Sequence, residues 1–135
     1  MRQPRWLKRR VLEIIHADNL ARYGGSPGIR AGGDQLIESA LARPKHRLIY
    51  QPDTTLAELA AAYLYGLAKN HGYIDGNKRI AFSAAVAFLR SNGIRLAAGD
   101  DEAYERVVGL VEDRYSEHDI AEWILSRSIP QESVE

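Results

Sequence analysis

The chain has 135 residues, and its 18 lysine and arginine residues are balanced by 18 aspartate and glutamate residues, so its formal net charge is zero. A chain of this length can bury the core of one domain, and the zero net charge gives no indication of nucleic-acid binding or of an acidic membrane partner. The absence of cysteine excludes disulfides, zinc thiolates and a cysteine nucleophile, and it fits a reducing cytoplasm. No stretch approaches the length of an apolar membrane span.

The two ends of the chain differ in charge. Residues 1–10 contain five cations and no acid, whereas residues 98–135 contain eleven acids and three cations. Such an asymmetry can steer a partner, but solvated helix faces are its more common cause. The basic start is not followed by a signal-peptide pattern, because the apolar run VLEIIH is short and is interrupted by Glu13. We therefore expect a cytoplasmic protein without a membrane partner.

The spacing of apolar residues predicts helices along nearly the whole chain. A first helix is expected over residues 6–23, followed by a break at GGSPG in residues 24–28. Asp34 can cap a short second helix, which Pro44 should prevent from continuing. For residues 45–53, KHRLIYQPD, we expect an extended strand or flap.

The middle of the chain contains the clearest helix signals. Thr55 and Glu58 have the spacing of a capping box, in which the hydroxyl and the carboxylate each accept a backbone N–H. A nearly all-round apolar pattern over residues 78–92 predicts the most buried helix of the fold. Asn92 and Gly93 should end this helix, since glycine suits the left-handed position just after a helix.

Two more helices are expected, one near residues 100–108 and one that begins at Ser116. The predicted fold is therefore all-α, a compact single-domain bundle of about six helices. We expect this domain to cover residues 1–129 and the tail at residues 130–135 to be frayed.

The stretch HGYIDGNKR, residues 71–79, joins two of the expected helices and predicts an anion site. Gly76 frees the backbone where the second helix begins, and the first N–H groups of a helix have no partner within it. The backbone from Gly76 to Lys78, with Asn77 between them, could therefore hold phosphate oxygens. Lys78 adds a point charge, and Arg79 adds a planar fork suited to two phosphate oxygens.

Two further side chains in the stretch suit chemistry on a phosphate. Asp75 is a hard oxygen ligand of the kind that Mg²⁺ shares with bound phosphates. His71 can accept a proton from a hydroxyl. Each group alone has a simpler explanation: His71 as a cation at a helix C-terminus, Asp75 as an N-cap, and the two cations as solvated side chains. Together they form the set of groups that phosphoryl or nucleotidyl transfer to a hydroxyl requires.

Two common motifs are excluded. The stretch is not a Walker A loop, because Gly72 and Gly76 have three residues between them and Asn77 separates the second glycine from Lys78. It is not a zinc site, because no second histidine stands at helical spacing and the chain has no cysteine.

HGYIDGNKR resembles the Fic/Doc motif, which reads histidine-x-aromatic-x-acid-glycine/alanine-asparagine-x-arginine. The resemblance is to the Doc (death-on-curing) branch: Lys78 stands where the Fic branch usually has glycine, and Phe82 stands where that branch has a second arginine. The segments IIHADNLARYGGSPGIR, LIESALARP and FLRSNG also resemble the family. Gly72 departs from the proline that is frequent after the histidine, which should loosen this residue. Tyr73 replaces phenylalanine and keeps an aromatic anchor.

The resemblance implies a toxin of a toxin–antitoxin pair. In the Doc branch it implies a kinase that uses ATP and Mg²⁺ and transfers the γ-phosphate to a hydroxyl of elongation factor Tu, a translation elongation factor. It implies that His71 is catalytic, that Asp75 holds the metal, and that four residues hold the phosphates: Gly76, Asn77, Lys78 and Arg79. It also suggests His16 and Arg30 as additional residues of the cleft, although a lone histidine on an apolar helix face is more often a core residue.

Two alternatives stay open: a Fic-type transfer of AMP, and a non-enzymatic module that blocks translation by binding. Many Fic proteins carry an inhibitory helix with the pattern Ser/Thr-x-x-x-Glu-Gly/Asn. Ser128 and Glu132 have this spacing but are followed by Ser133, and Thr54 and Glu58 have it but are followed by leucine. We therefore expect inhibition in trans by a small antitoxin protein.

Overall fold

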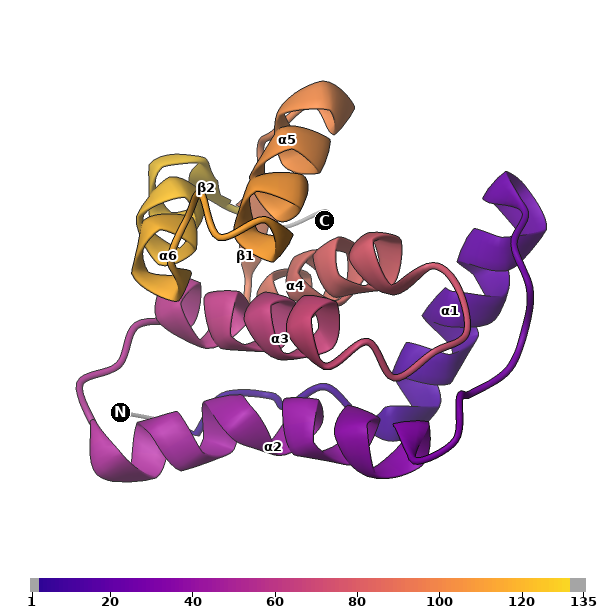
Figure 1. The fold of residues 1–135 in the computed structure, drawn as a ribbon. Coiled ribbons are helices and arrows are strands. Elements are labelled where there is room, and N and C mark those ends of the chain that lie inside the picture. Colours follow the sequence, from indigo (N-terminus) through magenta and orange to yellow (C-terminus); the bar gives the residue numbers. More distant parts are fainter. Residues whose placement is uncertain (1–2, 132–135) are drawn as a thin grey trace, which may run out of the picture.

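The computed structural model describes residues 3–131, and the fold within that range is all-helical apart from one two-stranded sheet (Figure 1). The predicted all-α class with six helices is confirmed. The elements are α1 (Arg9–Tyr23), α2 (Gly33–Tyr50), α3 (Leu56–Asn70), α4 (Asn77–Ser91), β1 (Ile94–Leu96), α5 (Asp100–Val111), α6 (Glu117–Ser126) and β2 (Ser128–Pro130).

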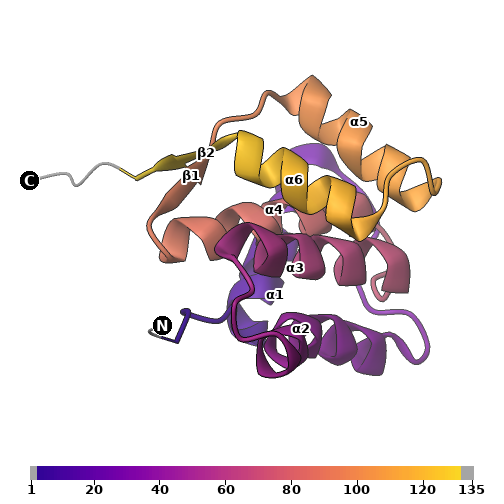
Figure 2. The same cartoon turned by 90° about the vertical axis from the view of Figure 1, so that its left-hand side faces the viewer.

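Helix α3 lies at the centre of the bundle and packs against α2, α4 and α6. Helix α2 covers one side of it, and α5 and α6 cover the opposite side (Figures 1 and 2). Ten of the 15 residues of α3 are buried, against seven of the 15 in α4, so the prediction that residues 78–92 form the most buried helix is wrong. The small side chains of the alanine run at residues 60–62 are fully buried, and they let neighbouring helices approach α3 closely.

Helix α2 corrects the prediction of a short helix followed by a strand. It begins after Gly32 rather than at Asp34, and it continues through Pro44 to Tyr50, so residues 45–50 are helical. Its buried face, Ile37, Ala40, Leu41 and Pro44, has helical spacing and packs against α3. Burial of this apolar face offsets the cost of a proline in a helix interior, about 3 kcal/mol.

The predicted capping box at the start of α3 is confirmed, and so is the predicted helix start at Ser116. The Glu58 backbone N–H donates to Thr55 Oγ1 at 3.1 Å, and the Thr55 N–H donates to Glu58 Oε1 at 2.9 Å. Ser116 and Asp119 form the same pair of bonds at the start of α6. The predicted end of the helix before Gly93 is also confirmed, because this glycine has a left-handed φ of 83°.

The C-terminal segment returns to the end of α4. Strand β2 pairs antiparallel with β1, and Arg95 faces Ile129 in this register. The Gln131 N–H donates to the Gly93 carbonyl at 2.9 Å. In the tail that was expected to be frayed, Pro130 belongs to β2, and residues 132–135 lie outside the described residues. Glu132, which has the inhibitory-helix spacing from Ser128, is therefore also outside them.

A second short pairing joins the loop after α1 to the loop after α3. Ile29 and Tyr73 form an isolated antiparallel bridge. The Arg30 N–H donates to the Gly72 carbonyl and the Ile74 N–H to the Gly28 carbonyl, each at 3.1 Å. Extended structure therefore occurs here rather than at residues 45–53. Over residues 3–131, no helix combines the length and apolar character that crossing a membrane requires.

Candidate functional site

The candidate site is the junction between α3 and α4. His71 ends α3 in a left-handed conformation, with φ 55° and ψ 50°, and its side chain is exposed. Gly76, with φ 80°, is the N-cap of α4 and makes no side-chain cap, so the next N–H groups point out of the helix start. The expected turn at this glycine is confirmed. Both ends of the loop thus depend on positive φ angles, which are rare for residues other than glycine.

Asn77 and Tyr73 hold the loop in shape. The Asn77 side chain is buried, its Nδ2 donates to the Tyr73 carbonyl at 2.9 Å, and its Oδ1 accepts the Tyr73 N–H at 3.0 Å. Because both ends of this amide are bonded to the loop, Asn77 can offer a phosphate its backbone N–H rather than its side chain.

Tyr73 anchors the loop to α1. Its ring is buried, and its hydroxyl donates to Glu13 Oε1 at 2.8 Å. Arg9 binds the same carboxylate oxygen at 2.7 Å. Burial, with the hydrogen bond to Glu13, raises the pKa of the Tyr73 hydroxyl well above its usual range. The aromatic residue expected to act as an anchor therefore does so through both its ring and its hydroxyl.

The Asp75 carboxylate is exposed and is oriented by two backbone donors. Its Oδ1 accepts the Gly76 N–H at 2.9 Å, and its Oδ2 accepts the Ser26 N–H at 3.2 Å. Each oxygen retains acceptor capacity for a cation, so the residue fits a Mg²⁺ ligand. No group of three histidine, aspartate or glutamate residues that could hold a metal occurs in residues 3–131. A metal at Asp75 would therefore take its remaining oxygen ligands from bound phosphates and water.

Lys78 and Arg79 lie exposed in the first turn of α4, which contains no acidic residue. Within residues 3–131 neither side chain forms an ion pair. The Arg79 guanidinium instead lies over the ring of Tyr23, 4.0 Å from its centre. Two cations that no carboxylate of residues 3–131 neutralises thus stand beside the positive end of a helix dipole, which favours an anion.

His16 and Arg30 both lie beside this junction, His16 through its side chain and Arg30 through its backbone. The His16 ring is buried against Tyr73, with ring centres 3.9 Å apart, and its Nε2 lies 3.0 Å from the Asp75 carbonyl oxygen. His16 is therefore a core residue that also supports the loop. Arg30 reaches the junction through its backbone bond to Gly72, and its side chain is exposed.

Gly72 is tightly packed where a loosening was expected. It is buried, and a Cβ atom at this position would lie 2.7 Å from Ile37 Cγ1 and 2.9 Å from the Gly33 carbonyl oxygen. Gly33 faces it with equally little room, because a Cβ there would lie 2.1 Å from the Gly72 carbonyl oxygen. The two glycines let the loop and the start of α2 approach at backbone distance.

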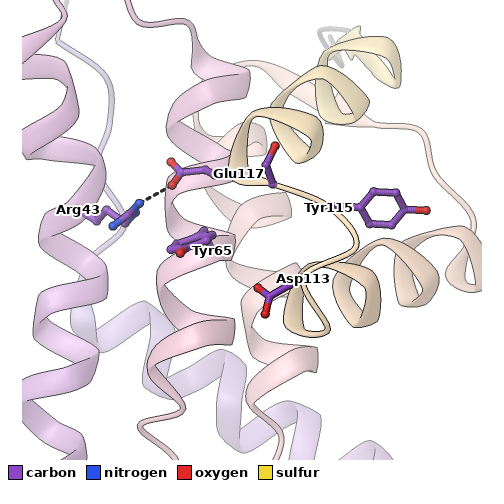
Figure 3. Close-up of a pocket in the computed structure, with 6 residues that line it drawn as sticks. Arg43, Tyr65, Asp113, Tyr115 and Glu117 are labelled. Atoms are coloured by element: carbon purple, nitrogen blue, oxygen red, sulfur yellow. Dashed lines mark hydrogen bonds and ion pairs between the residues drawn. The ribbon is translucent and has the colours of Figure 1, made fainter.

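Two hollows in the described surface lie elsewhere. One of about 360 Å³ is found between α2, α3 and the α5–α6 loop, where Arg43 pairs with Glu117 and lies over Tyr65 (Figure 3). A second of about 560 Å³ is lined mainly by α2 and shares Arg43 and Glu117. Neither contains a residue of the stretch 71–79. We place the site at the α3–α4 junction, because charge and free backbone donors meet there and the charges in the hollows are paired.

The end of α1 and the turn after it belong to the site, although the sequence indicates only a helix break at GGSPG. Tyr23 contacts Arg79, the Ser26 N–H bonds to Asp75, and Gly25 leaves no room for a Cβ atom beside the Asp75 carboxylate. The sequence signal here is a pair of adjacent glycines directly after an aromatic residue. This local pattern does not indicate a partner about 50 positions away, because the contacts with Asp75 and Arg79 depend on how α1 lies against α4.

The protein is thus a small all-helical domain, and its candidate phosphate site lies at the α3–α4 junction, where α4 begins. The Fic/DOC family model matches residues 6–89. The chain is 39% identical over 85 residues to Protein kinase doc of Escherichia phage P1, covering 63% of this chain and 66% of that protein. It is 42% identical over 91 residues to Toxin Doc of Mycolicibacterium smegmatis, covering 66% of this chain and 67% of that protein.

This chain belongs to the Fic/Doc family, as the motif at residues 71–79 indicated. The matches span about two thirds of the length of the two curated relatives.

Proposed function

We propose that this chain is the toxin of a toxin–antitoxin pair and acts as a protein kinase. In this proposal it transfers the γ-phosphate of ATP to a serine or threonine hydroxyl of a translation factor, elongation factor Tu. Support comes from family membership, from one relative named as a protein kinase and another as a toxin, and from the parts assembled at the α3–α4 junction. The proposal also includes a cytoplasmic location and inhibition in trans by a small antitoxin.

The observation that carries the proposal is that one short loop brings together an exposed histidine, a carboxylate and a candidate anion site. His71 is exposed at the end of α3, Asp75 is held by two backbone N–H groups, and α4 begins with two cations that have no acidic partner in residues 3–131. Phosphoryl transfer relies on positioning and charge stabilisation more than on covalent catalysis by the protein. A rigid loop with these groups meets that requirement.

The proposed step is an in-line displacement. The target hydroxyl gives its proton to an imidazole nitrogen of His71 as its oxygen bonds to the γ-phosphorus. The bond from that phosphorus to the β-phosphate oxygen breaks, and ADP leaves. Lys78, Arg79 and the N–H groups at the start of α4 hold the phosphate oxygens. Mg²⁺ at Asp75 would neutralise phosphate charge when bound.

Lys78 and Phe82 favour γ-phosphate transfer over AMP transfer. The lysine occupies space that a glycine would leave open for an α-phosphate. Phe82 is half-buried and packs towards Trp123, with ring centres 6.4 Å apart, so it cannot act as a clamp for further phosphates. Lys78→Gly should therefore weaken γ-phosphate transfer, and the missing second arginine should limit any AMP transfer that results.

Radiolabelled ATP separates the three possible functions. The protein is incubated with cell extract and either γ-labelled or α-labelled ATP, and labelled proteins are separated by electrophoresis. We expect one protein of the size of elongation factor Tu to be labelled by γ-labelled ATP and not by α-labelled ATP. Label from α-labelled ATP would establish AMP transfer, and growth arrest without either label would indicate a binding module.

A further inference from the structure

We propose that Tyr23, the last residue of α1, and Gly25 and Ser26, in the turn that follows it, are positioning residues for the phosphate site. The inference rests on the proposed function, and it adds three residues to the site that lie outside the motif at residues 71–79. Tyr23 orients the guanidinium of Arg79, and Gly25 with Ser26 orients the carboxylate of Asp75. None of the three contacts the reacting atoms in this proposal.

Tyr23 is suited to hold Arg79 without neutralising it. The guanidinium lies 4.0 Å from the centre of the Tyr23 ring, and Tyr23 as a residue is 61% exposed. A carboxylate in the same place would cancel the charge that a phosphate needs, whereas an aromatic face attracts the cation and leaves its N–H groups available. The stacked arginine is thus pre-oriented before a phosphate binds.

Gly25 and Ser26 fix the carboxylate of Asp75 from the other side. The Ser26 N–H donates to Asp75 Oδ2 at 3.2 Å. A Cβ atom on Gly25 would lie 2.9 Å from the same oxygen, and the residue has a φ of 117°. A glycine is therefore needed for the turn to approach the carboxylate closely enough for this bond.

The segment of residues 23–26, the end of α1 and the start of the turn after it, therefore reaches two groups with different proposed roles. Asp75 stands just before the start of α4 and Arg79 in its first turn, so both lie at the same end of that helix. Because this segment reaches both, it fixes their relative placement as well as each orientation. A phosphate bound to Arg79 and a metal bound to Asp75 must be adjacent for phosphoryl transfer.

The contribution of Tyr23 is measured by calorimetric titration with a non-hydrolysable ATP analogue. We expect Tyr23→Leu to lower the affinity roughly two- to fivefold, as loss of an exposed cation–π contact does. Tyr23→Phe, which retains the aromatic face, should stay within about twofold of the parent. In an Arg79→Ala background, Tyr23→Leu should cause no further loss. An equal loss in both backgrounds, or none in either, would overturn the role of Tyr23.

The contribution of Gly25 has a matched control in Gly24. Both glycines have positive φ, so alanine is strained at either position, but a Cβ on Gly24 would meet nothing within 4 Å. The titration is repeated with and without Mg²⁺. Gly25→Ala should reduce the gain in affinity that Mg²⁺ gives to the parent, whereas Gly24→Ala should retain it, with melting curves recorded for both. Equal effects of the two substitutions would contradict a specific role for Gly25.

Failure of the inference and failure of the proposed function give different results. A parent protein that binds no nucleotide, with or without Mg²⁺, would contradict both. A parent that binds nucleotide with Mg²⁺ but is matched by Tyr23→Leu and Gly25→Ala would overturn the positioning role alone. NMR gives a readout independent of nucleotide: the Arg79 Nε–H signal should carry a ring-current shift that persists in Tyr23→Phe and disappears in Tyr23→Leu.

Discussion

At the scale of single residues, the α3–α4 junction holds one strained residue, His71, next to residues that are fixed by hydrogen bonds and close packing. His71 adopts a left-handed conformation that costs a residue with a Cβ atom roughly 1–2 kcal/mol. The loop holds it there through Asn77, whose side chain is bonded to Tyr73, and through the glycine contact of Gly72 with Gly33. Such strain at an exposed histidine fits a role for its side chain outside the fold itself.

His71→Gly should separate function from stability. Glycine accepts the left-handed angle, and the exposed imidazole has no packing to lose, so the free energy of unfolding should rise by up to about 1 kcal/mol. Protein labelling should be lost at the same time. The measurements are urea unfolding and the γ-label assay, with His46→Ala, an exposed histidine on α2, as a control that retains activity. A marked loss of stability in His71→Gly would show that the histidine serves the fold.

Gly72→Ala should destabilise the protein by about 1–3 kcal/mol, the usual cost of overpacking a filled site. The added methyl group would lie 2.7 Å from Ile37 Cγ1, and backbone stands on its other side. Gly99→Ala is the control, because a Cβ there meets nothing within 4 Å and φ is −74°, so its cost should stay below about 1 kcal/mol. Equal melting temperatures for the two variants would show that the loop can move away from α2.

At the scale of elements, the starts of α3 and α6 are fixed by capping boxes. Thr55 and Glu58 cap α3, and Glu58 also pairs with Arg47 of α2 at 2.8 Å. Arg47 in turn pairs with Glu117 of α6 at 3.0 Å, so one arginine links three helices. The backbone bond from Thr55, with Arg47 nearby, lowers the pKa of the Glu58 carboxyl.

Thr55→Ala should cost about 1 kcal/mol of unfolding free energy, since it removes one half of the capping box. Thermal or urea unfolding measures the change. Ser91→Ala, at an exposed position at the end of α4, should be within about 0.5 kcal/mol of the parent. If both variants unfold at the same denaturant concentration, the cap does not determine where α3 begins.

Local signals predicted most of the helices, and their failures have physical reasons. The capping residues and Gly93 could be recognised because a cap depends on three or four neighbouring positions. Pro44 does not end α2, because its local cost is outweighed by burial of the α2 face against α3. The loop at residues 71–79 was recognisable from its chemistry, whereas its partners Tyr23 and Ser26 depend on a tertiary approach that no local pattern encodes.

At the scale of the whole molecule, the fold is organised around α3, with Tyr63 at its middle. This tyrosine is fully buried, packs against Phe88 with the two rings tilted and their centres 5.0 Å apart, and accepts the Leu7 N–H on its hydroxyl at 3.0 Å. Burial raises its pKa to about 12, while the bond from Leu7 acts in the opposite direction. The N-terminal segment and the centre of the core are therefore joined through a hydroxyl whose burial favours its protonated form.

The protein should lose stability in alkali. A group whose pKa is raised on folding contributes its full stability below its unfolded pKa of about 10, and this contribution is lost as pH rises through the folded value. For Tyr63 the window therefore runs from about pH 10 to about pH 12. Tyr63→Phe should flatten the decline of unfolding free energy across this window, which urea titrations at several pH values measure. An unchanged slope would show that the Tyr63 hydroxyl does not govern alkaline unfolding.

The proposed role of His71 as the base for transfer of the γ-phosphate is tested most directly by a rate measurement. Purified protein, γ-labelled ATP, Mg²⁺ and purified elongation factor Tu are mixed, and label transfer by the parent and by His71→Ala is followed over time, with melting curves to show that both are folded. The proposal predicts a rate roughly two to four orders of magnitude lower in His71→Ala. A folded His71→Ala protein that labels elongation factor Tu as fast as the parent would contradict it.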